Sequence, residues 1–215
     1  TTRRIKKDPI SNTFNFMSPY FIFFGILTFL ISFALYIYSL APSVTFEDSG
    51  ELIAAAYTAG VPHAPGYPLF TIFGWFFAHV PIGSIAYRLN MMSAFFSAIA
   101  AFWVYASVAI TSQMFAPKSR ISKIGFPSYF ISLIAGLLYA FSFENWEQSV
   151  ITEVYGLHSF FVGLFIFIVI RFIHQRDIKV RRKLIYFIAF STGLALTNHT
   201  TALLFIPVIT LVVIF

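Results

Sequence analysis

The residues of this sequence that are best suited to chemistry gather in one short stretch, residues 43–68, which reads SVTFEDSGELIAAAYTAGVPHAPGYP. Two acids stand three positions apart in it, Asp48 and Glu51, and His63 follows in a turn rich in proline and glycine. A carboxylate can act as a general base that takes a proton from a hydroxyl group. The stretch therefore predicts acid–base chemistry around Asp48 and Glu51.

The same two acids also fit a purely structural role. The pattern predicts a short helix that begins after Asp48 and ends before Gly60 and Pro62, with Glu51 reaching back as in a capping box. The dipole of that helix would favour both negative charges near its start. From the residues alone, the catalytic and the capping interpretations both remain open.

The elements that must position these acids are membrane helices. Of the 215 residues, 59% are hydrophobic and 10% are charged, whereas about 25% are charged in soluble domains. Six apolar runs predict membrane spans: residues 20–41, 89–111, 127–143, 150–170, 184–197 and 200–215. We expect an all-α polytopic membrane protein in which residues 1–215 form a single transmembrane domain surrounded by membrane lipids. The short apolar run 69–81 predicts a helix that lies along the interface.

Small residues on the run 89–111 predict a stripe that lets another helix approach closely: Ser93, Ala94, Ser97, Ala98 and Ala101.

The charges predict the orientation of these spans. Thirteen of the 14 Lys and Arg residues fall in segments 1–18, 112–126 and 171–183, whereas six of the eight acids share the opposite side with Arg88. Basic loops face the cytoplasm, so we expect a cytoplasmic N-terminus (1–18) and an outer first loop (42–87). The active face would then be periplasmic, extracellular or lumenal in the endoplasmic reticulum. Because the net charge of +6 is divided among membrane loops, no nucleic-acid partner is expected.

Four segments resemble one family of membrane proteins. They are DSGELIAAAYTAGVPHAPGYPLF (48–70), IAYRLNMMSA (85–94), FENWEQSVITEVYGLHSFF (143–161) and GLALTNHTTALLFIP (193–207). They are similar to the domain of unknown function 2723 family, which includes transmembrane protein 260-like proteins and is placed with the GT-C glycosyltransferases, relatives of the protein O-mannosyltransferases. The sequence departs from the expected His-Pro-Pro-Gly motif, because it has Ala64 after His63.

The resemblance implies a GT-C-like N-terminal half of a longer protein. It implies transfer of a sugar such as mannose from a polyprenyl-phosphate-linked donor to an acceptor hydroxyl on a protein or glycan. In GT-C enzymes an acid of the first outer loop is the base, and Asp48 is the matching position, with Glu51 assisting. Arg88, the lone outer cation, is expected to bind the lipid-phosphate of the donor. The other residues expected to bind substrate are His63, Tyr67, Glu153, His158, Asn198 and His199.

The residues also leave alternatives. A divalent metal would need His63 and His199 to converge with carboxylates, and no close-spaced ligand motif supports one, so no metal or cofactor is expected. A transporter is disfavoured because none of the six runs has an ionisable residue near its centre. A non-catalytic subunit or scaffold that works with partner membrane subunits remains open, because a fold can persist without activity.

Overall fold

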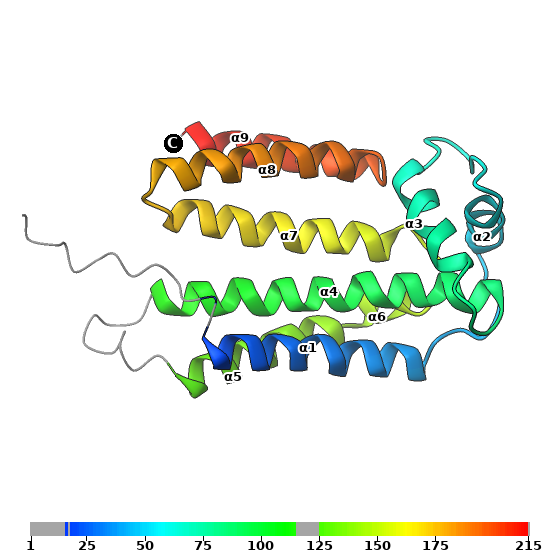
Figure 1. Ribbon diagram of the computed structural model, residues 1–215, viewed down its shortest axis with the longest axis horizontal. Helices are drawn as coiled ribbons and strands as arrows, with labels where there is room; N and C mark the ends of the chain where they lie inside the picture. Colours follow the sequence, from blue (N-terminus) through cyan, green and yellow to red (C-terminus); the bar gives the residue numbers. More distant parts are fainter. Residues whose placement is uncertain (1–15, 17, 115–124, 215) are drawn as a thin grey trace, which may run out of the picture.

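The structure, a computed structural model, describes residues 16, 18–114 and 125–214, and over these residues its regular elements are all helices. The all-α fold predicted from the sequence is confirmed. Six helices lie side by side along the bundle (Figure 1): α1 (Pro19–Tyr38), α4 (Ile85–Met114), α5 (Phe126–Ala140), α7 (Tyr155–His174), α8 (Ile178–Leu196) and α9 (Phe205–Ile214). Two short helices, α2 (Ser49–Thr58) and α3 (Pro68–Ala78), cover one end of the bundle, as expected for residues 42–87.

The predicted count of six spans is not confirmed. By length and composition, α1, α4 and α7 can each cross a membrane, and the described residues give up to four spans if the bent pair α5 and α6 (Phe143–Ser149) counts as one. The axes of that pair differ by 68°. Helix α8 is not apolar enough to count as a span, because its first turns carry several Lys and Arg residues. Helix α9 is too short, because it has only 10 residues after the 3-10 helix η2 (Thr200–Leu204).

The basic segment 171–183 is not the loop that the sequence suggested. Helix α7 continues to His174 and α8 begins at Ile178, so only three residues connect them. Asp177 caps α8 by accepting a hydrogen bond from the Lys179 backbone N–H at 2.8 Å. Lys and Arg side chains are good helix formers, and this explains why charge did not interrupt the helix.

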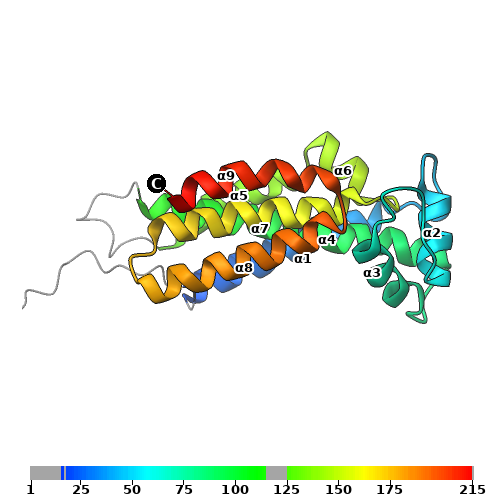
Figure 2. The same cartoon turned by 90° about the horizontal axis from the view of Figure 1, so that it is seen from above.

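Helix α4 lies at the centre of the bundle, with α1 and α5 on one side and α7 on the other (Figure 1), and from above α8 and α9 flank α7 (Figure 2). The small residues predicted to form a packing stripe on it are all buried: Ser93, Ala94, Ser97, Ala98 and Ala101. A Cβ added to Gly156 of α7 would lie 2.9 Å from the carbonyl oxygen of Ser93, and one added to Gly136 of α5 would lie 3.0 Å from that of Ala101. The predicted close approach of neighbouring helices is confirmed.

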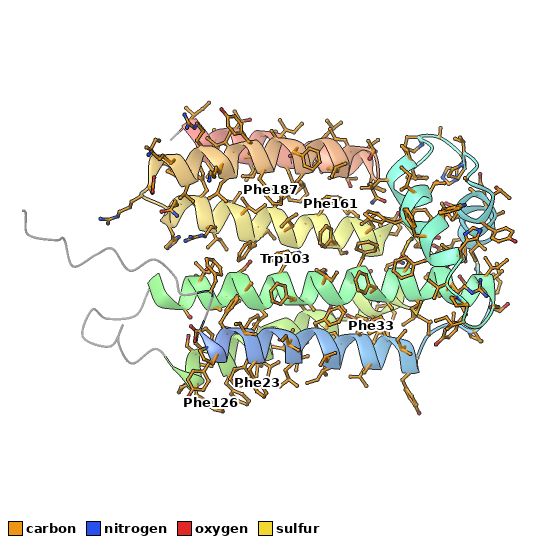
Figure 3. All side chains as sticks on the ribbon, in the orientation of Figure 1. Phe23, Phe33, Trp103, Phe126, Phe161 and Phe187 are labelled. Carbon is orange, nitrogen blue, oxygen red and sulfur yellow. The ribbon has the colours of Figure 1, made fainter. Side chains whose placement is uncertain are left out.

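Aromatic side chains fill the bundle and cover its surface (Figure 3). Trp103 packs on Phe167 between α4 and α7, with ring centroids 4.9 Å apart. Phe23, Phe126 and Phe187 are exposed on the outer surface of the bundle. Apolar surface of this extent suits lipid rather than water, and with the apolar spans it identifies an integral membrane protein.

Acids and bases occupy opposite ends of the bundle. The end that carries α2 and α3 also holds α6 and the start of α7, with the acids Glu144, Glu147 and Glu153 (Figure 1). The end of α7 and the start of α8, with Arg171 and Lys179, lie at the far end. The same segment also holds Arg176, Arg181, Arg182 and Lys183, and the basic residues that remain on that side fall on 1–15 and 115–124, outside the described residues. The predicted segregation of charge therefore holds for the part of the chain that can be placed.

Candidate active site

A buried asparagine holds the loop that leads to the first acids. Asn90 of α4 is fully buried and donates from Nδ2 to the carbonyl oxygens of Ala41 (2.8 Å) and Ser43 (3.1 Å). Its Oδ1 accepts a hydrogen bond from the hydroxyl of Thr152 at 2.5 Å. The chain before α2 and the chain before α7 are thus tied to the same point of α4.

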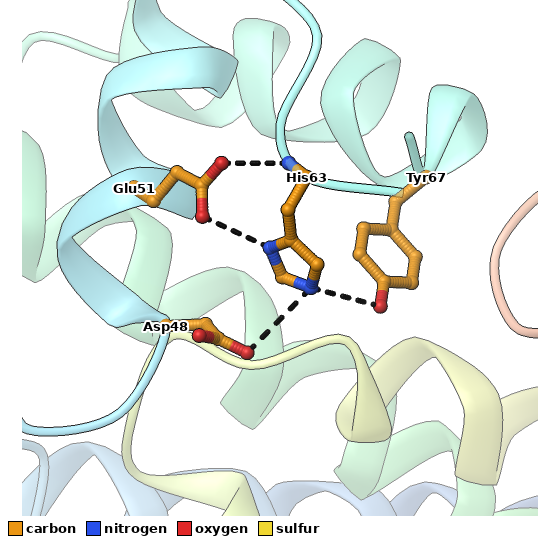
Figure 4. Close-up of polar contacts among 4 residues, drawn as sticks. All are labelled: Asp48, Glu51, His63 and Tyr67. Atoms are coloured by element: carbon orange, nitrogen blue, oxygen red, sulfur yellow. Dashed lines mark hydrogen bonds and ion pairs between the residues drawn. The ribbon is translucent and has the colours of Figure 1, made fainter. Parts of the chain in front are cut away.

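Helix α2 begins where the sequence predicted, but its acids do not cap it. Asp48 is the N-cap residue, yet its side chain makes no capping hydrogen bond. Glu51 turns toward His63 instead (Figure 4): Oε1 accepts from the His63 backbone N–H at 2.6 Å, and Oε2 lies 2.9 Å from Nδ1. The predicted helix is confirmed, whereas the capping-box interpretation of the two side chains is wrong.

The imidazole of His63 joins three other side chains. Its Nε2 lies 3.7 Å from Oδ2 of Asp48 and 3.3 Å from the hydroxyl of Tyr67 (Figure 4). We call Asp48, Glu51, His63 and Tyr67 the α2–α3 cluster. Three non-glycine residues at this end have left-handed backbones, Glu47 (φ 64°), Ala59 (φ 51°) and Tyr67 (φ 39°), and such strain is often found at functional sites.

The contacts within the cluster set its charges. Hydrogen bonds from His63 lower the pKa of the Glu51 carboxyl, and the hydrogen bond to Glu51 raises the pKa of the His63 imidazole. The charge of nearby Asp48 raises the pKa of His63 further. Glu51 therefore stays ionised, and Asp48 presents an exposed carboxylate beside an imidazole.

Glu153 lies next to the cluster, at the end of the segment that precedes α7. It is only 4% exposed, and its carboxyl group accepts hydrogen bonds from the backbone N–H groups of Val154 and Asp48. Its Oε1 has no hydrogen-bond partner among the described residues. Burial, together with the charges of Asp48 and Glu47, raises the pKa of Glu153 to about 7. A carboxyl group that exchanges its proton near neutral pH thus contacts the backbone of Asp48.

A second group of side chains lies next to the cluster, around His199 at the start of η2. The His199 ring stacks on Tyr67 with centroids 6.5 Å apart, and lies 5.0 Å from His158 and 5.5 Å from Tyr155. The Thr201 hydroxyl lies 2.6 Å from Nδ1 of His199 and 3.2 Å from Nε2 of His158. Burial lowers the pKa of His199. Tyr67 therefore links two polar groups that come from distant parts of the sequence.

Two of the predicted substrate-binding residues are engaged in holding the fold. Asn198 is fully buried and donates to the carbonyl oxygen of Val154 at 3.2 Å. Arg88 donates from Nε, Nη1 and Nη2 to the carbonyl oxygens of Ile82 (2.5 Å), Ala78 (2.6 Å) and Gly83 (3.0 Å). Arg88 thus closes the end of α3, and its binding of the donor phosphate stays a prediction.

The remaining predicted residues do come together. The structure groups Asp48, Glu51, His63, Tyr67 and Glu153 at one point, with His158 and His199 beside them. The sequence interpretation missed Asn90 and Thr152, which tie the supporting loops to α4. The only signal for them was their position inside two of the four family-like segments.

Asp48, Glu51 and His63 can each offer one ligand atom to a metal, and the three atoms lie within 4.8 Å of one another. The sequence required His63 and His199 to converge with carboxylates, and only His63 does so. Among the described residues, this is the one group of three or more His or acid side chains with that spacing.

Comparisons with known proteins identify the family of the chain. A family model described as the N-terminal domain of protein O-mannosyl-transferase TMEM260 matches residues 48–215. The chain is 37% identical over 174 residues to "Protein O-mannosyl-transferase TMEM260" of Mus musculus, covering 80% of this chain and 23% of that protein. It is 29% identical over 195 residues to the Dictyostelium discoideum protein of the same name, covering 85% and 22%. No solved structure matches, and the chain spans less than a quarter of the length of these relatives. The chain belongs to the TMEM260 N-terminal domain family.

Proposed function

We propose that this chain is the first part of a membrane mannosyltransferase that moves mannose from a polyprenyl-phosphate-linked donor to a hydroxyl group of a protein acceptor. The names of the relatives support the sugar and the kind of acceptor. The observation that carries the proposal is the Asp48 carboxylate, which stands exposed at the start of α2 without the capping bond that would occupy it. An acid left free at such a position is available to a substrate.

The cluster supports a direct role for Asp48 as the general base. During transfer the acceptor hydroxyl gives its proton to Asp48, its oxygen bonds to the anomeric carbon, and the bond from that carbon to the phosphate breaks, so that polyprenyl phosphate leaves. Glu51 holds the backbone and ring of His63, which keeps the imidazole beside Asp48. Tyr67 and His199 offer aromatic faces and polar atoms suited to sugar hydroxyl groups.

An apolar groove beside the cluster suits the lipid of the donor. It has a volume of about 550 Å³ and is formed by the turn after α2 and by α3, including Val61, Pro65, Ile72, Trp75 and Phe76. Small-molecule sites are mostly apolar with a few placed polar groups. The turn that lines this groove also carries His63, so a lipid chain in the groove would bring its phosphate near the cluster.

The distribution of charge favours reaction at the outer or lumenal face. The described basic residues of 171–183 lie at the end of the bundle opposite the cluster, and basic segments face the cytoplasm. The cluster would then face the periplasm, the cell exterior or the lumen of the endoplasmic reticulum.

A non-catalytic subunit of a larger complex is the second candidate. Transport is less well supported, because the Asp, Glu, Lys and Arg residues within α1, α4 and α7 are limited to Arg88 in the first turn of α4 and Arg171 in the last turns of α7. Transport sites place ionisable groups near the middle of spans.

The test is Asp48→Asn in the natural full-length protein. Asparagine is as good an N-cap residue as aspartate, but it cannot take a proton. We expect transfer of labelled mannose from a synthetic polyprenyl phosphate mannose to an acceptor protein to fall by about 10²-fold or more, with an unchanged melting temperature. Glu147→Gln, which changes an exposed acid of the same end, is the control.

Retained transfer in Asp48→Asn would contradict the base assignment. If the wild-type protein transfers no mannose but copurifies stoichiometrically with a transferase whose activity depends on it, the scaffold function replaces this proposal.

A further inference from the structure

The end of the bundle that carries α2 holds more negative charge than the described cations balance. Asp48 and Glu51 stand beside Glu47 and the buried Glu153. In the described part of the chain, the only ion pairs at these acids come from His63. The Arg88 guanidinium donates to three backbone carbonyls and forms no ion pair with an acid of the described part of the chain. A negatively charged phosphate would be repelled here unless a further cation accompanied it.

The geometry of His63 provides a place for that cation. Glu51 lies 2.9 Å from Nδ1, and a proton held in that hydrogen bond leaves the lone pair of Nε2 facing the Asp48 carboxylate and the Tyr67 hydroxyl. The Nε2 to Oδ2 distance of 3.7 Å is too long for a good hydrogen bond. It suits two ligands of one ion, each about 2.1 Å from the centre and separated by an angle of roughly 120°. A carboxylate that orients a ligand histidine from its other nitrogen is a common support in metal sites.

Glu153 supplies an independent observation. Its side chain is more than nine-tenths buried, one oxygen has no partner among the described residues, and the same carboxyl group contacts the Asp48 backbone. It also interacts electrostatically with His63. A buried polar atom without a partner destabilises the folded state, so its retention calls for a ligand. A water molecule bound to an ion at Asp48 and His63 could satisfy that oxygen.

We infer that Asp48 and His63 hold a divalent cation, with Glu51 fixing the imidazole and Glu153 supporting the ion from behind. A site with two protein ligands leaves open positions for water and for a phosphate oxygen, as is typical of ions that carry substrate phosphates. Mixed imidazole and carboxylate ligands suit an ion such as Mn²⁺. One Asp48 oxygen binds the ion, and the other remains for the acceptor proton.

The function of this ion rests on the proposed sugar transfer, although its binding does not. When the sugar leaves, the electron pair of the broken bond passes to the phosphate oxygen, and the ion stabilises that added charge. Because His63 is a neutral ligand when it binds the ion, no described side chain of the cluster then carries a cationic group for this purpose.

The binding test uses Mn²⁺ as the probe on purified full-length protein that has first been stripped with EDTA. We expect one Mn²⁺ per chain in an electron paramagnetic resonance titration, and an electron spin-echo signal from one imidazole nitrogen. His63→Gln should abolish the nitrogen signal, and Asp48→Asn should weaken binding by about 10-fold or more. Glu51→Gln should weaken binding by about 10- to 100-fold, as for other orienting partners, and Glu147→Gln should change nothing.

Two results overturn the inference: no stoichiometric Mn²⁺ in the wild type, or a nitrogen signal that survives in folded His63→Gln. The two proposals also fail separately. Wild-type protein that transfers mannose at its full rate after EDTA treatment would retain the proposed function and eliminate the metal. Wild-type protein that binds Mn²⁺ through His63 but transfers no mannose would retain the metal site and eliminate the function.

Discussion

Glu153 gives a quantitative prediction for the pH dependence of stability, because burial disfavours the ionised form of its carboxyl group. The carboxyl pKa is raised from 4.5 to about 7 by burial and by the charges of Asp48 and Glu47. Between these two pH values the folded protein keeps a proton that the unfolded chain has already released. By linkage, the free energy of unfolding must fall as pH rises through this window.

The size of this effect follows from the shift. A difference of about 2.5 pKa units at about 1.4 kcal/mol per unit makes the folded state about 3 kcal/mol less stable at pH 8 than at pH 4.5, from this group alone. Glutamine resembles the protonated form at all pH values, so Glu153→Gln should remove this slope. For a domain of this size, 3 kcal/mol corresponds to about 6–12 °C in melting temperature.

The assay is the melting temperature of wild type and Glu153→Gln in detergent with EDTA at pH 5, 6, 7 and 8. The difference between the two curves isolates Glu153, because every other titrating group is present in both proteins. The melting temperature of the variant, taken relative to that of the wild type, should rise steadily with pH. A constant difference in melting temperature between the two proteins does not affect this trend. Glu147→Gln, an exposed acid of the same end, should run parallel to the wild type. Parallel curves for Glu153→Gln as well would refute the assignment of a raised pKa to this carboxyl group.

Three further predictions test packing, anchoring and orientation. Gly156→Ala should destabilise the protein by about 1–3 kcal/mol because its Cβ meets the α4 backbone, whereas Gly193→Ala, which meets nothing within 4 Å, should raise the melting temperature slightly. Arg88→Lys should lower the melting temperature and the affinity for a synthetic polyprenyl phosphate together; a lower melting temperature alone would limit Arg88 to closing α3. Single cysteines at exposed Thr58 and Ile178 in a cysteine-free full-length protein should react with an impermeant reagent from opposite sides, and labelling of both from one side would contradict the orientation.

Apolar length and small-residue spacing were enough to predict most of the fold. The stripe from Ser93 to Ala101 repeats at helical spacing, so its burial follows from local sequence. The span count is not confirmed at α8, where two local rules conflict. The basic residues after Asp177 carry charge typical of a loop, but they are also good helix formers, and α8 begins among them.

The partners of the acids could not be predicted in the same way. A spacing of three residues between Asp48 and Glu51 is compatible with a capping box, and nothing local opposes it. In the structure the Glu51 carboxylate contacts the backbone N–H and the ring of His63, twelve residues further along the chain, and not the start of its own helix. Periodicity carries no information about contacts of this kind, because they depend on how the turn folds back.

Hydrogen bonds made by three buried side chains explain why the position of Asp48 depends on the helix bundle and not only on the loop that carries it. Asn90 holds the chain before α2 from α4, and Asn198 holds the start of α7 from the turn after α8. Glu153 joins that same start of α7 to the backbone of Asp48. Each tie crosses between segments more than forty residues apart, so the position of Asp48 depends on three helices at once. Substitutions at these buried residues should therefore shift the position of Asp48 without contacting its carboxylate, which makes no capping hydrogen bond of its own.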